Sequence, residues 1–198
     1  MRSSIIVLAT LGAMASGLRL KQSTCSFPAP SSNFTRLAYS GEWYEIAKFQ
    51  TAGGAFFEQN CVCTQLNVTF GANPDDYFAG NICRDKTPEG DLINAVGSLL
   101  NENPAGRFKE SFFEYAPSVD YTILFLGEMD GEEFSVEYDC GSSFFGTNYC
   151  VHFLSRKPTL SQKVLDYLVS EVNKLNLNYE NLPLQMTKQE GCWNNAVM

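Results

Sequence analysis

Apolar and polar residues alternate along most of the chain in short runs, and clusters of turn-forming residues separate these runs. A period of two is typical of strands that bury one face. The pattern predicts eight strands, at residues 42–50, 61–70, 76–84, 91–99, 107–115, 120–126, 133–140 and 148–156. The breaks between them are rich in Gly, Pro, Asn and Asp, as at residues 53–54 and 87–90.

One later segment follows a different period. After Pro158 and Thr159, apolar residues recur at helical spacing, at Val164, Leu165, Leu168, Val172 and Leu175. A last short strand is predicted near residues 183–187. Eight antiparallel strands can close into an up-and-down barrel that is just wide enough for one small ligand. The predicted fold is therefore an all-β barrel of eight antiparallel strands with one C-terminal α-helix.

The start of the chain predicts export. A short basic start, an apolar run from Ile5 to Ala15 and small residues up to Gly17 are typical of a signal peptide, here residues 1–17. Residues 18–198 then form a single domain. Seven cysteines follow the signal and indicate a disulfide framework in a secreted, extracellular protein. Glycosylation sequons at Asn33 and Asn67 agree with this location.

Composition excludes several classes of function. The formal net charge of −8 disfavours binding to nucleic acid or to an anionic membrane. No segment after the signal is long and apolar enough for a membrane span, so stable membrane insertion is not expected. The Cys61-x-Cys63 pair lacks the second pair of ligands that a zinc site needs, so no metal site is predicted.

Three stretches carry a resemblance to a known family. Residues 41–47, Gly-Glu-Trp-Tyr-Glu-Ile-Ala, resemble the first motif of the lipocalins, and residues 154–158, Leu-Ser-Arg-Lys-Pro, resemble their third motif. Residues 134–140 are similar to the strand before that motif. The nearest group is that of apolipoprotein D and the bilin-binding proteins. Residues 125–130 depart from the family pattern, and an altered, slightly longer turn is expected there.

This resemblance implies structural roles and two disulfides. Arg156 should stack on Trp43 and close the barrel floor beside Gly41, through a cation–π contact worth about 0.5–2 kcal/mol. The resemblance also pairs Cys25 with Cys140 and Cys63 with Cys192. Each bond would tie a chain end to the outside of the barrel and stabilise it by about 2–4 kcal/mol.

Side-chain parity places the remaining cysteines. In strand 61–70, a glycan on Asn67 must point outward, and Cys61 shares its face. In the next strand, Phe78 and Ile82 suit the interior, so Cys83 should also face outward. We therefore predict a third disulfide, Cys61–Cys83. Cys150 is left as a free thiol on an inward face, either as a small buried hydrophobe or as a ligand tether or nucleophile.

The same parity places ionisable groups inside the barrel. His152, the only histidine, shares a face with Arg156, which must reach the floor. Because Cys140 must face outward, Glu137 faces inward on the neighbouring strand and meets His152. Two interpretations stay open: a polar contact for the end of a ligand, or a mutually satisfied buried pair.

Apolar side chains complete the predicted lumen. Parity and the mouth loop of the family suggest the following ligand-contacting residues, in addition to His152 and Glu137: Phe49, Phe56, Phe57, Val62, Leu66, Val68, Phe108, Phe112, Tyr121 and Ile123. Taken singly, each aromatic ring among them is more readily explained by plain packing than by ligand contact.

These features predict a carrier for a small hydrophobic or amphipathic ligand, and not an enzyme. The cargo could be a pigment such as a bilin or carotenoid, a retinoid, a sterol or a fatty acid, and no other cofactor is expected. One alternative is an isomerase of the lipocalin type that uses Cys150 as a lumenal thiol. Another is a surface-recognition protein that dimerises through its odd cysteine, so the protein is either a monomer or a dimer.

Overall fold

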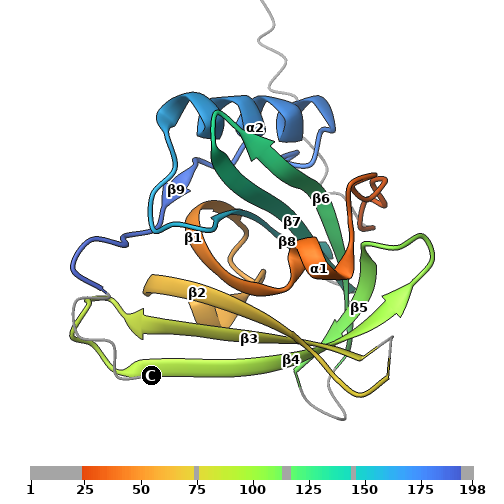
Figure 1. Cartoon of the computed structure of the whole chain (residues 1–198), viewed down its shortest axis with the longest axis horizontal. Coiled ribbons are helices and arrows are strands. Elements are labelled where there is room, and N and C mark those ends of the chain that lie inside the picture. The colour runs from red at the N-terminus through yellow and green to blue at the C-terminus, as the bar shows by residue number, and fades with distance from the viewer. Residues whose placement is uncertain (1–23, 74–75, 113–116, 144–145, 193–198) are drawn as a thin grey trace, which may run out of the picture.

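The computed structural model describes residues 24–73, 76–112, 117–143 and 146–192. Eight strands form one antiparallel sheet in the chain order predicted (Figure 1). They are β1 (Gly41–Gln50), β2 (Cys61–Phe70), β3 (Asp76–Asp85), β4 (Leu92–Glu102), β5 (Arg107–Ser111), β6 (Val119–Met129), β7 (Glu132–Ser143) and β8 (Gly146–Ser155). Each strand pairs with the next, and β1 pairs with both β8 and β2, which closes the barrel. The predicted fold class is confirmed.

The C-terminal tail completes the barrel wall. β1 and β2 pair only over Gly41–Tyr44. Beyond that point β9 (Gln185–Met186) runs beside β1. The tail residue Lys188 accepts a hydrogen bond from Cys63 N on β2, at 2.8 Å. The tail therefore satisfies backbone groups that the diverging strands would otherwise leave unpaired.

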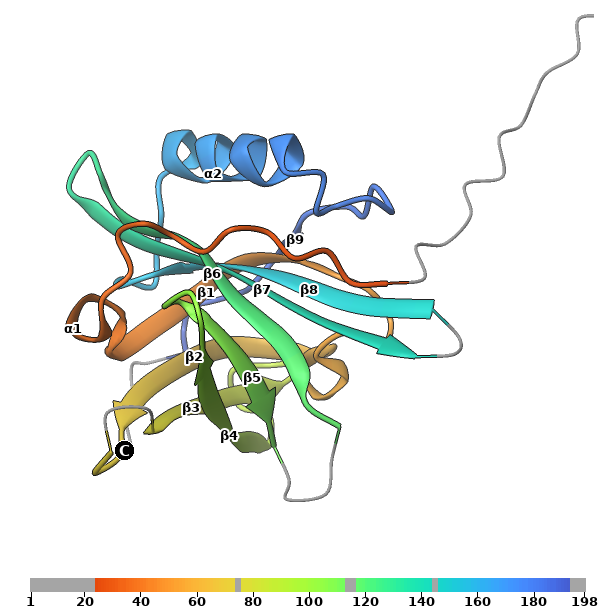
Figure 2. The ribbon, with the colours of Figure 1, turned by 90° about the vertical axis from the view of Figure 1, so that its right-hand side faces the viewer.

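Helix α2 (Gln162–Lys174) lies across the outside of the barrel (Figure 2). It begins after Ser161, whose side chain caps the amide of Val164. Its buried residues Val164, Leu165, Leu168 and Val172 pack on the outer faces of β1, β7 and β8. Leu175, predicted on the same stripe, is 44% exposed because it caps the helix end. No helix among the described residues has the length and hydrophobicity to cross a membrane.

The turn between β6 and β7 is tighter than expected. Met129 pairs directly with Glu132, so only Asp130 and Gly131 form the turn. Both have positive φ, 55° and 78°, which is the geometry of a two-residue hairpin. The expectation of a longer loop was wrong, because the altered residues 125–129 extend β6 instead.

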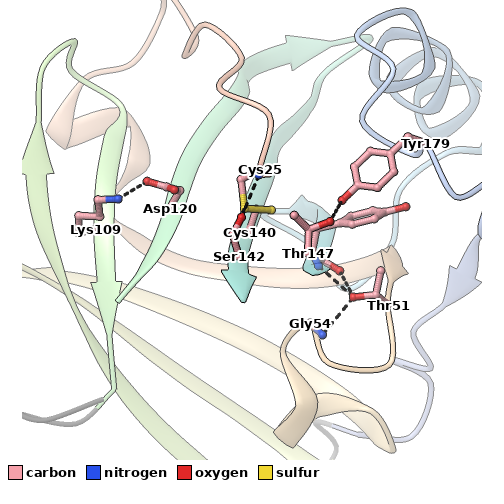
Figure 3. Close-up of a disulfide and its surroundings, with 10 residues drawn as sticks. Cys25, Thr51, Gly54, Lys109, Asp120, Cys140, Ser142, Thr147 and Tyr179 are labelled. Atoms are coloured by element: carbon pink, nitrogen blue, oxygen red, sulfur yellow. Dashed lines mark hydrogen bonds and ion pairs between the residues drawn. A yellow bond between two sulfur atoms is a disulfide. The ribbon is translucent and has the colours of Figure 1, made fainter. Parts of the chain in front are cut away.

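All three predicted disulfides are present. Cys25–Cys140 holds the N-terminal segment against the end of β7, where Cys25 N also donates to Ser142 Oγ at 3.0 Å (Figure 3). Cys63–Cys192 fastens the C-terminal tail to β2. Cys61–Cys83 joins β2 to β3.

Cys61 and Cys83 form the predicted disulfide, but Cys83 does not lie on the predicted outer face. Cys83 is 2% exposed and shares its inward face with Tyr77 and Ala79, whereas Phe78 is 39% exposed. A bulge in β2, at a left-handed Cys63 (φ 58°), reverses the faces on its two sides and brings Cys61 to the face of Cys83.

Candidate functional site

The barrel encloses a cavity of about 480 Å³. All eight barrel strands contribute to its walls, and the loop between β1 and β2 lines one end. Its apolar lining includes Leu66, Ile93, Ala95, Phe112 and Leu154. Cavities of about 300–1,000 Å³ with apolar walls and a few convergent polar groups are typical ligand sites.

A packed floor closes the cavity at one end. Arg156 Cζ lies 3.5 Å from the centre of the Trp43 ring. The Arg156 guanidinium also donates to the carbonyl oxygens of Ala38, Ser40 and Glu42 at 2.7–2.8 Å. Gly41 (φ 88°) lies beside this guanidinium. The structure thus has the floor contact that the motifs predict.

His152 is held between two carboxylates on the cavity wall. Its Nδ1 lies 2.6 Å from Glu45 Oε2 and its Nε2 lies 3.1 Å from Asp139 Oδ2. Burial would lower the pKa of His152, but the hydrogen bonds to Asp139 and Glu45 outweigh it and raise this pKa well above its ordinary value. The group is therefore an imidazolium at neutral pH.

Glu45, a buried acid, has two further partners besides His152. Its Oε1 accepts from Thr187 Oγ1 on the tail at 2.5 Å and lies 3.3 Å from Lys48 Nζ. Burial would raise the pKa of Glu45, but the charge of Lys48 and the hydrogen bond from His152 prevail and lower it to about 2. Glu45 therefore carries a negative charge inside the barrel at neutral pH.

Glu137 belongs to a different network. It lies opposite His152 in the β7–β8 register, as predicted. Its carboxylate, however, accepts hydrogen bonds from the hydroxyls of Tyr121 and Ser135, while His152 bonds to Glu45 and Asp139. The interpretation as a mutually bonded His152–Glu137 pair was wrong, because each side chain has closer partners.

Two further glutamates face the cavity. Glu58, in the 3-10 helix η1 (Phe56–Glu58), is 4% exposed, and Glu110 of β5 is 6% exposed. Burial raises the pKa of Glu58 to about 7. Burial, together with the charges of Asp139 and Glu58, raises the pKa of Glu110 well above its ordinary value.

Comparison with solved structures identifies the architecture. Insecticyanin from the tobacco hornworm Manduca sexta matches with a TM-score of 0.63 at 15% identity, over 84% of this chain and 87% of that one. Lobster apocrustacyanin A1 matches with a TM-score of 0.59 at 17% identity, over 79% and 81%. The fold is that of a lipocalin. No family model and no curated protein matches the sequence.

Within this lipocalin barrel, six of the predicted lumenal residues line the cavity. They are Phe57, Leu66, Phe112, Tyr121, Glu137 and His152. Phe57 and Phe112 meet edge to face with ring centres 5.0 Å apart. Val68, Phe108 and Ile123 lie inside the barrel but pack with Trp43 in the floor cluster, so they do not line the cavity. The side chain of Phe56 lies outside the described part of the structure.

Phe49 and Val62 were assigned to the wrong face. A bulge between Glu45 and Ala47 reverses the parity of β1, so Phe49 points outward and packs against Phe153 under helix α2, with ring centres 5.6 Å apart. The bulge in β2 does the same to Val62, which does not line the cavity. One inserted residue in a strand shifts the alternation of inward and outward side chains. Residues beyond it then face the side opposite to the one that simple alternation predicts.

Cys150 is the one unpaired cysteine of the described residues. It is completely buried, and its Sγ lies 3.9 Å from His152 Nδ1. It is absent from the cavity lining. Burial raises the pKa of its thiol to about 12, so the thiol is neutral.

The two sequon asparagines, Asn33 and Asn67, are both exposed. Asn67 lies on the outer face of β2, which parity required. Glycosylation at either position stays a prediction.

The cavity is more acidic than the sequence pattern predicts. Glu45, Glu58 and Glu110 line it and are not among the predicted site residues. Strand alternation points to two of them. Glu45 lies on the same face of its strand as Trp43, and Glu110 lies on the same face as Phe108 and Phe112. Glu58 lies in a loop where no alternation applies, so only the structure could place it.

Proposed function

We propose that this protein is a secreted carrier that binds a small hydrophobic or amphipathic ligand inside the barrel. The cavity of about 480 Å³, closed by the Trp43–Arg156 floor, is the observation that carries this proposal. Apolar burial on its walls would drive binding, and the buried polar groups would orient the ligand. The three disulfides are typical of proteins from oxidising, extracellular compartments and support secretion.

The class of cargo follows from the sequence resemblance to the bilin-binding group. A bilin or carotenoid pigment heads the candidates, followed by retinoids, sterols and fatty acids. An absorbance spectrum of the purified protein, with mass spectrometry of an organic extract, would identify a retained pigment. A colourless protein whose extract contains no conjugated compound would contradict the pigment assignment and leave the carrier proposal to the next test.

Two neighbouring residues of β4 give a matched test of cavity binding. Ala95 lines the cavity, whereas Val96 is 57% exposed on the outer face. A bulky indole at position 95 would occupy ligand space. We expect Ala95→Trp to weaken the binding of an apolar fluorescent probe by about tenfold or more, and Val96→Trp to leave it unchanged. If both variants and the parent bound the probe with equal affinity, the probe would bind outside this cavity.

The geometry gives the two alternatives no support. An isomerase that used Cys150 would need a thiolate open to the cavity, and this thiol is neutral and fully buried. A dimer linked through Cys150 would need the same thiol at the surface. We therefore propose that the chain is a carrier without thiol catalysis.

A further inference from the structure

The cavity holds more acidic groups than basic ones. Among the described residues, five carboxyl groups line it, from Glu45, Glu58, Glu110, Glu137 and Asp139. The basic groups at the site are His152, in the wall, and the buried Lys48 beside Glu45. Buried charge is costly unless it is paired, so a carboxyl group here must find a partner in the protein, hold its proton, or bind a cation that the protein does not supply.

Three of the acids are satisfied by protein groups. Glu45 contacts Lys48 and His152, and Asp139 contacts the other nitrogen of His152. Glu137 accepts from Tyr121 and a neighbouring serine. These three need no ligand.

Glu58 and Glu110 are not satisfied in this way. Glu58 Oε2 is buried and accepts no hydrogen bond from the described residues. Lys48 Nζ donates to the backbone oxygen of Glu58, at 3.1 Å, rather than to its carboxylate. Glu110 pairs through its backbone with β4 and β6, but its side chain makes no hydrogen bond or ion pair with the described residues. A buried carboxyl without a partner is a position for a donor that the protein does not itself supply.

We propose that the natural ligand is a cationic amphiphile, whose protonated amine is bound by the carboxylates of Glu58 and Glu110 and whose apolar body lies against the remaining walls. This inference rests on the proposed carrier function and narrows its ligand class. An ammonium supplies hydrogen-bond donors and a positive charge together, which is what this pair of carboxylates lacks.

A divalent metal ion is the competing cation, and the geometry disfavours it. Ligand atoms of Glu45, Glu58 and His152 lie within 4.8 Å of one another. However, both ring nitrogens of His152 already face carboxylates, and Lys48 Nζ lies 3.3 Å from Glu45. A metal would have to displace a proton from His152 and approach a fixed ammonium, whereas an organic cation at Glu58 and Glu110 disturbs neither.

Three probes of equal chain length test the inference. Decylammonium, decanol and decanoate would each compete with an apolar fluorescent probe at pH 8, where Glu58 is ionised and the amine is still protonated. Charge-assisted hydrogen bonds predict that decylammonium binds about tenfold or more tightly than decanol, and decanoate most weakly. A Glu58→Gln/Glu110→Gln variant should lose this preference while retaining decanol binding. Glu89→Gln, at an exposed position, is the matched control.

The possible results of this experiment distinguish the inference of a cationic ligand from the proposed carrier function. Equal binding of decylammonium and decanol, or an unchanged preference in the double variant, would overturn the cation inference and leave the carrier function standing. Tight Zn²⁺ binding that removes the amine preference would also overturn it, in favour of a metal site. If the protein bound neither the fluorescent probe nor any of the three ten-carbon compounds, the carrier function itself would be overturned. Circular dichroism of the double variant checks that it is folded, and the single variants provide the same test if it is not.

Discussion

Glu58 is a buried carboxyl whose pKa is raised to about 7 from an ordinary value of 4.5. The folded state therefore holds its proton more tightly than the unfolded chain does. The resulting stability is fully present below pH 4.5 and is lost as the pH rises through about 7. By pH 8 the loss is on the order of 3 kcal/mol.

Glu58→Gln should remove this pH dependence. We expect the variant and the parent to have similar free energies of unfolding at pH 4.5, and the variant to be more stable at pH 8 by roughly 1–3 kcal/mol. Urea denaturation at both pH values measures this difference, with Glu89→Gln as an exposed control. A constant difference between variant and parent at both values would show that Glu58 titrates normally.

Single residues were predictable where a motif or a parity rule applied to them. Trp43 and Arg156 were placed by their motifs, and His152 by its alternation with Arg156. What parity could not reveal is which groups bond to each other. His152 bonds across to Glu45 on β1, and this depends on how the barrel closes rather than on the β7–β8 pair.

At the scale of elements, the strand positions and the helix were predicted well because period and turn residues are local properties. The faces of β1 and β2 were not predicted beyond their bulges. A bulge inserts one residue with no change in composition, so alternation on its two sides looks continuous in the sequence. Phe49 and Val62 were misplaced for this one reason.

Helix α2 packs on the barrel through its buried stripe. Leu168 is completely buried against the barrel, whereas Leu175 at the helix end is 44% exposed. Leu168→Ala should lower the free energy of unfolding by about 2–5 kcal/mol, because it leaves a cavity between helix and sheet. The same substitution at Leu175 should change it by less than about 1 kcal/mol. Urea denaturation of both variants tests this, and similar losses would mean that the helix does not pack as described.

At the scale of the whole molecule, the C-terminal tail links barrel closure to the polar site. Gln189 Nε2 donates to the backbone oxygens of Glu45 and Thr64, at 2.8 Å each, and so bridges β1 and β2 where they diverge. Thr187 holds the Glu45 carboxylate from the same tail. The sequence predicted a short last strand there but not this role, because the gap between β1 and β2 follows from the three-dimensional course of both strands.

The disulfide that fastens this tail should therefore matter more than the one within the sheet. Cys63–Cys192 spans 129 residues, whereas Cys61–Cys83 spans 22. For the long loop of the first pair, loop-closure entropy raises the expected loss on replacement by alanine to about 5 kcal/mol, above the usual 2–4 kcal/mol, and for the second pair it gives about 3 kcal/mol. Urea denaturation of Cys63→Ala/Cys192→Ala and Cys61→Ala/Cys83→Ala gives both values.

The first variant should also expose tail amides to hydrogen exchange and weaken probe binding, since Glu45 loses the support of Thr187 and Gln189. If the first variant were the more stable of the two and kept its tail protected, the tail would be held by its hydrogen bonds to β1 and β2 without help from the disulfide.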